Sequence, residues 1–190
     1  MDIASLSYVQ RKAASALENG ILHFHCDREP DMVNFLRERA SLFEAKAKSR
    51  TYLLLDEEAL HQGKIRIAAF FSLAPQVMFV PPDLSVRQVR RLDGFSGKIH
   101  GRKIEALPAV LIGQLAKEDH FAESITGHEI LAHAWNVIGK AHAAIGGRIV
   151  MVDVKSSAEG LIRFYERENF KFISQSEETG LSQLIYMLSG

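Results

Sequence analysis

The chain has 190 residues, of which 47% are hydrophobic and 24% charged, so its composition excludes a largely disordered chain. Its 23 basic and 23 acidic residues cancel, which argues against non-specific nucleic-acid binding by the whole surface. The single cysteine, Cys26, excludes an intrachain disulfide and fits a reducing compartment. No apolar run reaches the roughly 18 residues that span a bilayer, and the N-terminus lacks the apolar centre of a signal peptide. We therefore expect a cytoplasmic protein without membrane contact.

The N-terminal part of the chain predicts two amphipathic helices. Apolar residues recur at helical spacing from Leu6 until Gly20 stops the run, so residues 1–20 are expected to form a helical extension. Residues 21–26, "ILHFHC", are a short strand candidate. A second helix is expected over residues 27–47, with Asp31 placed to cap it.

A hairpin is expected next. Two apolar runs at 50–56 and 65–74 flank a short polar segment at 57–64 that contains Gly63, which is the pattern of two strands joined by a turn. Residues 84–104 are expected to form a short helix followed by a loop.

The C-terminal part alternates strand and helix patterns. Strands are expected at 106–116, 147–154, 170–174 and 182–188, and helices at 127–144 and 158–168. Such an order predicts a mixed α/β sheet with helices packed on it. No linker divides the chain, so residues 1–190 are expected to form a single domain.

Several segments together resemble one family. "LIRFYERENFKFI" (161–173) resembles the end of a GNAT acetyltransferase, in which a helix carrying Phe-Tyr-Glu leads into a strand. "PAVLIGQLAKEDHFAESITGHEILAHA" (108–134) resembles the central strand, loop and helix of that family, where acyl-CoA binds. "FHCDREPDMVNFLRERA" and "RTYLLLDEE" resemble the opening of the GNAT branch that includes toxin acetyltransferases. The resemblance covers residues 22–190 and implies a mostly antiparallel central sheet.

The resemblance implies an acyl-CoA-dependent N-acetyltransferase that transfers an acetyl group from acetyl-CoA to a primary amine. Tyr165 would protonate the departing thiolate, since a phenol with a pKa of about 10 matches a thiolate of similar basicity. Glu118, beside Asp119 at the strand end, is the candidate general base. The residues expected to hold acyl-CoA are Leu115, Ala116, Lys117, Glu123, Ser124, Ile125, Thr126, Gly127, His128 and Ser157.

The pyrophosphate loop departs from the family pattern. Gln/Arg-x-x-Gly-x-Gly/Ala falls on residues 122–127, where only Gly127 matches. Glu123 places a carboxylate beside the expected phosphates, and the β-branched Ile125 resists the positive φ that glycine allows. We therefore expect weak acyl-CoA binding, and two readings stay open: an enzyme, or a GNAT-like protein without turnover that binds a partner.

Residues 84–104 form a basic segment. They contain six cationic side chains against Asp93, a net charge of +5, and those cations are Arg87, Arg90, Arg91, Lys98, Arg102 and Lys103. In the toxin branch such a segment borders the acceptor groove, which makes aminoacyl-tRNA a candidate acceptor. The resemblance to this branch also makes an antitoxin or a second copy a candidate partner. The alternative is an exposed charged loop.

Some residues invite a prediction of their own. His128 and His133 are five positions apart, so they do not share a helix face and no metal site is expected. Cys26 has no obvious base partner, which favours a buried structural thiol. Asn169 stands where the family has glycine, and it is expected to adopt positive φ.

Overall fold

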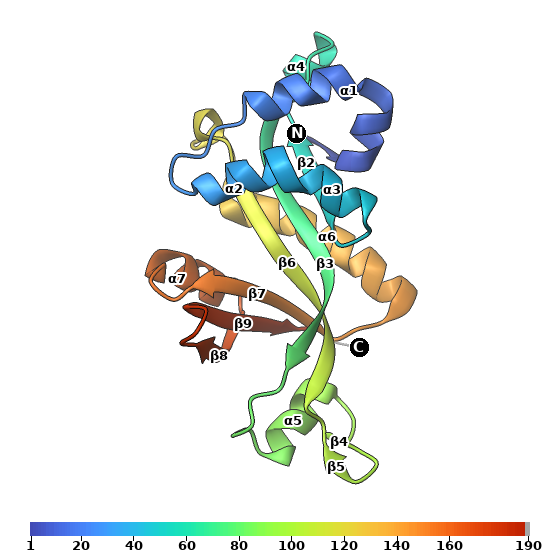
Figure 1. Cartoon of the computed structure of the whole chain (residues 1–190), viewed down its shortest axis with the longest axis vertical. Helices are drawn as coiled ribbons and strands as arrows, with labels where there is room; N and C mark the ends of the chain where they lie inside the picture. Colours follow the sequence, from blue (N-terminus) through green and yellow to red (C-terminus); the bar gives the residue numbers. More distant parts are fainter. Residues whose placement is uncertain (189–190) are drawn as a thin grey trace. The chain divides into compact units, whose positions relative to one another are not determined.

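We describe residues 1–188 in a computed structural model of the chain, drawn with its labels in Figure 1. The strands are β1 (Asp2–Ser5), β2 (Arg50–Leu55), β3 (Ile67–Phe79), β4 (Lys98–Ile99), β5 (Arg102–Lys103), β6 (Ala106–Lys117), β7 (Ile149–Lys155), β8 (Lys171–Ser176) and β9 (Leu181–Met187). The α-helices are α1 (Leu6–Leu22), α2 (Pro30–Asn34), α3 (Ala40–Ala45), α4 (Glu57–His61), α5 (Val86–Asp93), α6 (Gly127–Ile145) and α7 (Glu159–Arg167). A π-helical turn, η1 (Phe35–Arg39), joins α2 to α3, and a 3-10 turn, η2 (Asp119–Phe121), follows β6.

A seven-stranded sheet has the order β1-β2-β3-β6-β7-β9-β8, and β4 and β5 form a separate hairpin. Strands β6 and β7 are parallel, with Ala109 opposite Ile149. The pairs β1–β2, β2–β3, β7–β9 and β8–β9 are antiparallel. This confirms the predicted mixed, mostly antiparallel sheet flanked by helices.

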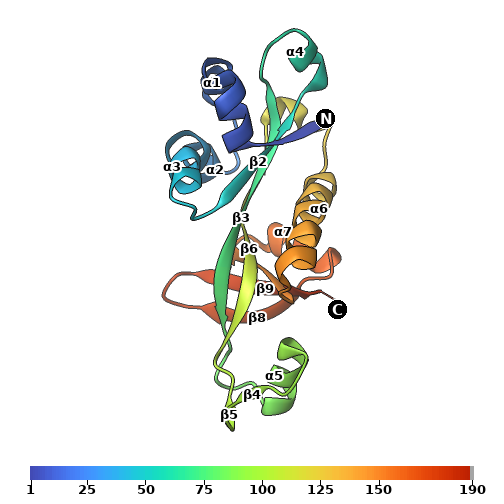
Figure 2. The same ribbon diagram turned by 90° about the vertical axis from the view of Figure 1, so that its right-hand side faces the viewer.

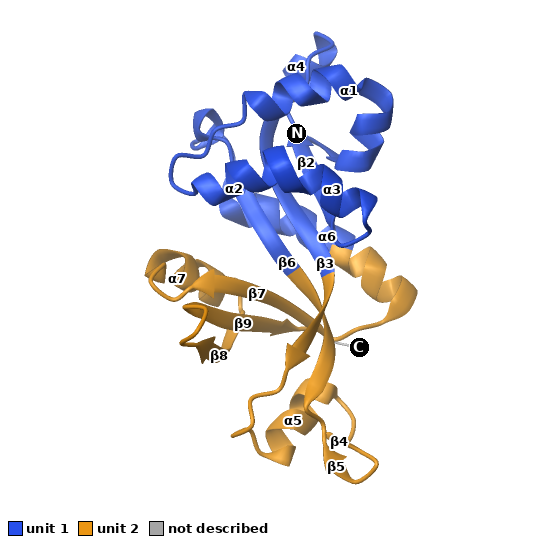
Figure 3. Ribbon diagram, in the orientation of Figure 1, with its two compact units in different colours: residues 1–74, 112–137 blue, residues 75–111, 138–190 orange. Residues whose placement is uncertain are grey.

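The chain divides into two compact units, coloured in Figure 3. Unit 1 comprises residues 1–74 and 112–137, and unit 2 comprises residues 75–111 and 138–190. Strands β3 and β6 and helix α6 therefore contribute residues to both units. The single domain of residues 1–190 stays a prediction.

Unit 1 is built around the hairpin of β2 and β3. Figure 2 shows α1, α2 and α3 on one face of these strands, and the first part of α6 on the other. The core under α1–α3 contains Leu6, Phe35, Leu36, Leu53 and Phe70, all at most 7% exposed. The predicted amphipathic helices therefore bury their apolar faces against this hairpin.

Unit 2 has its own core. It is formed by the ends of β3 and β6, by α5 and by β7 and β9, and includes Met78, Val89, Leu92, Met151 and Ile185. Helix α5 begins with a capping box, in which Ser85 and Gln88 satisfy each other's backbone N–H groups. No helix among residues 1–188 is long and apolar enough to cross a membrane.

Most predicted elements are confirmed, including the strands β2, β3, β6, β7, β8 and β9 and the helices α1, α5, α6 and α7. Asn169 has φ 66°, as predicted for the turn between α7 and β8. The loop expected at the end of 84–104 contains the short hairpin β4–β5.

The helical extension at residues 1–20 is wrong at its start. Residues 2–5 form strand β1, whose Ile3 lies opposite Leu54 of β2, and α1 begins only at Leu6. This strand is four residues long and exists because β2 offers it an edge, a tertiary effect that the local pattern does not contain.

The strand candidate at 21–26 is also wrong, because α1 continues to Leu22. The Arg37 guanidinium donates to the carbonyl oxygens of Leu22 and Phe24 at 2.9 and 3.1 Å, so a side chain takes the place of a neighbouring strand. The Phe24 side chain is buried in the core of unit 1.

Two smaller predictions are corrected as well. Asp31 does not cap the second helix, because Pro30 occupies its first position and Glu29 precedes it. The polar segment at 57–64 is not a simple turn. It forms the short helix α4, capped by the Asp56 carboxylate, which accepts from the Glu58 N–H at 3.0 Å.

Candidate functional site

The end of β6 and the loop after it lie in unit 1. Leu115, Ala116 and Lys117 are the last residues of the strand, and Ala116 packs into the core. The Lys117 Nζ donates to the carbonyl oxygens of Ala122 at 2.6 Å and Ile125 at 3.1 Å. This ammonium group therefore fixes the course of the loop by binding its backbone.

The loop uses most of its own backbone donors. The N–H groups of Phe121, Ala122, Ser124 and Ile125 donate to carbonyl oxygens of residues 118–121 at 3.0–3.1 Å. The N–H groups of Glu123 and Gly127 make no hydrogen bond within residues 1–188. A pyrophosphate is held mainly by free N–H groups, so this loop offers it few donors.

The side chains of the loop divide into buried and exposed ones. Phe121 and Ile125 are buried at 9% and 3% exposure, and the Arg66 guanidinium lies 4.7 Å from the centre of the Phe121 ring. Ile125 does not adopt positive φ. It replaces the family's glycine as a core residue. Glu123 and Ser124 are exposed.

The start of α6 carries its own anion. The Glu129 carboxylate accepts from the Thr126 N–H at 2.7 Å and from the Thr126 hydroxyl at 2.8 Å, while the Thr126 Oγ1 accepts from the Glu129 N–H at 3.2 Å. The hydrogen bond from the Thr126 N–H is the main cause that lowers the pKa of Glu129. The start of a helix attracts anions, and at α6 the Glu129 carboxylate already occupies this position.

Glu118 is a buried carboxylate, and its residue is 3% exposed. Its two oxygens accept from the His120 N–H at 3.0 Å and contact the His120 Nδ1 at 2.7 Å. The neighbouring Asp119 accepts from the Asp27 N–H at 2.8 Å. Glu118 is thus arranged to orient an exposed imidazole, whereas Asp119 anchors the chain between α1 and α2.

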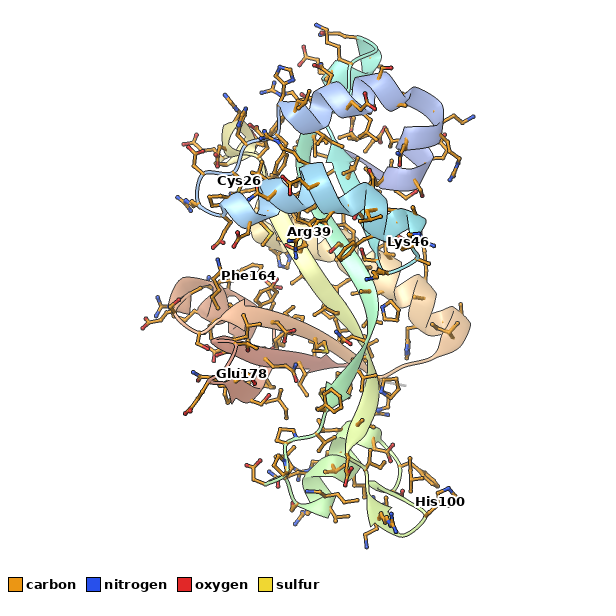
Figure 4. All side chains as sticks on the ribbon, in the orientation of Figure 1. Cys26, Arg39, Lys46, His100, Phe164 and Glu178 are labelled. Atoms are coloured by element: carbon orange, nitrogen blue, oxygen red, sulfur yellow. The ribbon has the colours of Figure 1, made fainter. Side chains whose placement is uncertain are left out.

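A cavity of about 540 Å³ lies beside this pair, within unit 1. Charged and imidazole side chains of both signs line it, including those of His23, Lys64, Arg66, Glu118 and His120. Residues 1–188 contain no group of three or more His, Cys, Asp or Glu side chains that could hold a metal ion. Cys26, labelled in Figure 4, is partly buried, and burial raises the pKa of its thiol.

Tyr165 lies on α7 in unit 2. It is 5% exposed, and its ring packs edge-on against Phe164 at 5.1 Å and Phe170 at 5.2 Å between centres. Burial raises the pKa of Tyr165 well above its usual range. The buried phenol is therefore a weaker acid than an exposed tyrosine, and it keeps its proton at neutral pH.

Ser157 is exposed in the connection between β7 and α7. Its neighbour Ser156 is tied down, because its Oγ lies 2.9 Å from the Ser182 Oγ on β9. Ser157 lies two residues before the start of α7, and Tyr165 lies within this helix.

The basic segment, residues 84–104, also belongs to unit 2. Lys103 donates to the carbonyl oxygens of Pro82 and Leu84, which uses its charge internally. The remaining cations lie on α5 and on the β4–β5 hairpin, whose tip carries His100 (Figure 4). Phe95, between the helix and the hairpin, is 83% exposed.

Two of these features were not predicted from the sequence. Thr-x-x-Glu at residues 126–129 is a recognisable capping-box pattern, and it would have indicated that Glu129 caps α6. Phe95 stands between two glycines in the basic segment, which is the one signal for an aromatic side chain presented by a turn.

A comparison of the sequence with protein-family models and with curated proteins gives no match. The structure, however, is similar to solved structures of the toxins KacT and AtaT. A tyrosine-to-phenylalanine variant of KacT matches with a TM-score of 0.71 and 20% identity, covering 98% of this chain and 94% of KacT. AtaT complexed with acetyl-methionyl-tRNAfMet gives 0.67 and 18% over 88% and 86% of the two chains.

A further structure, AtaTR bound with acetyl-CoA, matches with a TM-score of 0.66 and 18% identity, covering 98% of this chain and 92% of the other. At these identities the likeness establishes the fold. The predicted GNAT-like fold is thereby confirmed.

Proposed function

We propose that this chain is an acyl-CoA-dependent N-acetyltransferase with acetyl-CoA as co-substrate and a primary amine as acceptor. The observation that carries the proposal is the likeness of nearly the whole fold to AtaT in a structure that contains acetyl-CoA. Tyr165 on α7 supports it, because its Phe-Tyr-Glu segment corresponds to that of the family's proton donor. Its burial opposes the role, since a raised pKa makes the phenol a weaker acid.

In the proposed reaction the amine nitrogen attacks the thioester carbonyl carbon. A carbon–nitrogen bond forms, the carbon–sulfur bond breaks, and the sulfur keeps the electron pair. Tyr165 then donates its hydroxyl proton to this thiolate. We assign the proton lost by the amine to the candidate base Glu118, whose carboxylate lies 2.7 Å from the His120 Nδ1.

The loop after β6 fits acyl-CoA only in part. The N–H groups of Glu123 and Gly127, together with the positive end of α6, are its donors to a pyrophosphate. The carboxylates of Glu123 and Glu129 oppose the ligand's charge. Leu115–Lys117, Ser124–Thr126, His128 and Ser157 stay in the proposed site, and we expect weak binding.

We further propose aminoacyl-tRNA as the acceptor, in the cytoplasm, and an antitoxin or a second copy as protein partner. The AtaT complex with acetyl-methionyl-tRNAfMet and the AtaT variant bound to the C-terminus of the antitoxin AtaR support this proposal by analogy. The basic segment supports it physically, because cationic side chains draw in a polyphosphate acceptor.

The test is an acetyl-transfer assay on the full chain. An aminoacyl-tRNA pool, a lysine-containing peptide and a small primary amine are each incubated with acetyl-CoA, and N-acetyl products are detected by mass spectrometry. Tyr165→Phe should lower kcat by about tenfold or more while leaving acetyl-CoA affinity nearly unchanged. Tyr52→Phe is the matched control, because Tyr52 stacks on Phe71 in unit 1 and is not among the proposed site residues.

A second candidate function is supported by the loop itself. Its internal hydrogen bonds and the Glu129 cap favour a GNAT-like protein that binds a partner without turnover. Transfer to none of the acceptors, combined with no calorimetric signal for acetyl-CoA, would overturn the enzyme proposal and leave this one.

A further inference from the structure

The connection between α5 and β4 holds an aromatic ring in solvent. Phe95 is 83% exposed, and it borders a hollow of about 410 Å³ lined by Arg87, Arg90, Arg91 and Gly94. A phenylalanine so exposed contributes little to folding, because its apolar surface stays in water. Its place among arginines therefore calls for a role in binding.

The backbone of this connection is fixed by its own hydrogen bonds. The Asp93 carboxylate accepts from the N–H groups of Ser96 at 2.9 Å and Gly97 at 3.1 Å, and these bonds lower the pKa of Asp93. Gly94 is left-handed, with φ 80°, and its N–H donates to the Arg90 carbonyl at 2.8 Å. A fixed backbone reduces the entropy lost when a ligand binds to the Phe95 ring.

Arg90 holds the aromatic residue directly. Its Nε donates to the Phe95 carbonyl oxygen at 3.1 Å, so its guanidinium is committed to the connection. The guanidinium groups of Arg87 and Arg91, on the same helix, make no ion pair or hydrogen bond within residues 1–188. Two uncommitted guanidinium groups thus accompany the ring.

An exposed ring with uncommitted arginines matches one ligand chemistry well. Unpaired nucleobases stack on aromatic side chains, and the adjoining phosphates bind arginine. In a duplex the faces of the bases are covered by their neighbours, so an exposed ring binds unpaired strands in preference to paired ones.

We propose that Phe95, Arg87 and Arg91 form a subsite for an unpaired RNA nucleobase and its flanking phosphates. This inference deepens the proposed function, on which it rests for RNA as acceptor. It places the unpaired end of an aminoacyl-tRNA, rather than its helical stem, against the connection after α5. An acidic protein segment is the competing occupant, and the experiment separates the two.

The test measures binding to the full chain without acetyl-CoA, so it does not depend on turnover. The probes are an unpaired RNA of about 12 nucleotides, the same RNA annealed to its complement, inorganic polyphosphate and a poly-glutamate peptide. Phe95→Ala should weaken binding of the unpaired RNA by about 5- to 150-fold, the range for loss of one stacked base. Binding of duplex and polyphosphate should not change.

Two further variants complete the test. Phe95→Tyr should restore affinity, and Phe172→Ala should have no effect, because Phe172 is also exposed, at 54%, but lies on β8. In Phe95→Trp, indole fluorescence should be quenched by unpaired RNA and not by duplex.

Equal weakening for polyphosphate, or no weakening by Phe95→Ala, would overturn the stacking subsite. A Phe95→Trp signal that responds to poly-glutamate and not to RNA would overturn it in favour of a protein partner. Acetyl transfer to RNA with an unaltered Phe95→Ala affinity would remove this subsite while the proposed function stands. Stacking of unpaired RNA on Phe95 without any acetyl transfer would support this subsite and remove the proposed function.

Discussion

The connection after β6 and the connection after α5 are both held by hydrogen bonds to their own backbone, yet they place apolar side chains in opposite ways. Residues 118–126 bury Phe121 and Ile125. Residues 94–97 leave Phe95 in solvent. The first therefore gains stability from its apolar residues, and the second keeps an apolar surface available for a ligand.

The two connections also differ in the charge beside them. A carboxylate, Glu129, accepts hydrogen bonds at the start of α6, where a ligand anion would bind. A neutral amide, Gln88, does the same at the start of α5, which leaves the arginines of that helix as the dominant charge. One helix start is thus poorly suited to anions, and the other surface is well suited to them.

The largest effect on stability is expected when the buried Ile125 side chain in the connection after β6 is truncated. Ile125→Ala should lower the free energy of unfolding by about 2–5 kcal/mol, because it truncates a core side chain of a residue that is only 3% exposed. Urea unfolding of the full chain measures it, with the adjacent exposed Ser124→Ala as control. A loss below about 1 kcal/mol would show that this loop is not packed as a core segment.

The burial of Ile125 also affects a substitution that would restore the family's glycine at this position. From the sequence, Ile125→Gly should help a ligand approach the loop. In the structure the same change removes a core residue, and we expect its cost in stability to exceed any gain in ligand affinity.

The next effect tests whether the second connection is rigid. At Gly97, φ is 68° and an added Cβ would lie 2.7 Å from the Arg90 N and 2.8 Å from the Val86 O. Gly97→Ala should cost about 2–4 kcal/mol, from backbone strain and from this overlap. Gly63→Ala is the matched control: its φ is 71°, but nothing lies within 4 Å, so only the strain of about 1–2 kcal/mol remains.

Thermal unfolding of the two glycine variants provides the measurement. Equal losses would mean that the connection after α5 relaxes around the new methyl group. Its backbone would then not be fixed, and Phe95 would not be held in place for stacking.

The sequence identifies most of the fold because burial in these strands is a local pattern. Strands β2, β6 and β7 are rich in apolar residues. Asn169 indicates a position of positive φ, because few residues other than glycine and asparagine tolerate it. Strand β1 could not be predicted, because it depends on an edge supplied by β2. The carbonyl groups of Leu22 and Phe24 similarly depend on Arg37, a partner from another helix.

The candidate site could be predicted as a strand, a loop and a helix start, but not in its hydrogen bonding. The sequence places Lys117 at the strand end, yet only the structure shows that its ammonium binds the Ala122 and Ile125 carbonyls. The sequence shows that residues 122–127 depart from the family pattern. Only the structure shows that backbone N–H groups of this loop donate to the loop's own carbonyl oxygens.

A smaller effect separates the two arginines of α5. Arg91→Gln should reduce the slope of log affinity against log salt for unpaired RNA by about one, the loss of one phosphate contact. Arg90→Gln should leave this slope nearly unchanged and instead weaken discrimination between unpaired and duplex RNA, because the Arg90 guanidinium holds the Phe95 carbonyl. Salt titrations on both RNAs test this difference. Identical behaviour of the two variants would contradict distinct roles.

The smallest effect concerns the anion at the start of α6. Glu129→Gln keeps an acceptor for the Thr126 N–H and removes only the charge, so acetyl-CoA binding should tighten by about 2- to 5-fold at low salt. Glu123→Gln should tighten it less, since Glu123 is exposed and makes no hydrogen bond to the helix start. Calorimetric titration of both variants gives the comparison.

The same carboxylate gives the helix start a pH dependence of known sign. The pKa of Glu129 is lowered from 4.5 in the folded chain, so its contribution to stability is present above that value and is lost as pH falls through the folded pKa. In Glu129→Gln this part of the acid destabilisation should disappear, while Glu123→Gln should retain it. If Glu129→Gln neither tightens acetyl-CoA binding nor changes the acid limb, the carboxylate does not compete with the ligand. Weak binding would then follow from the N–H groups that the loop has already used, and the connection after β6 would be a structural one.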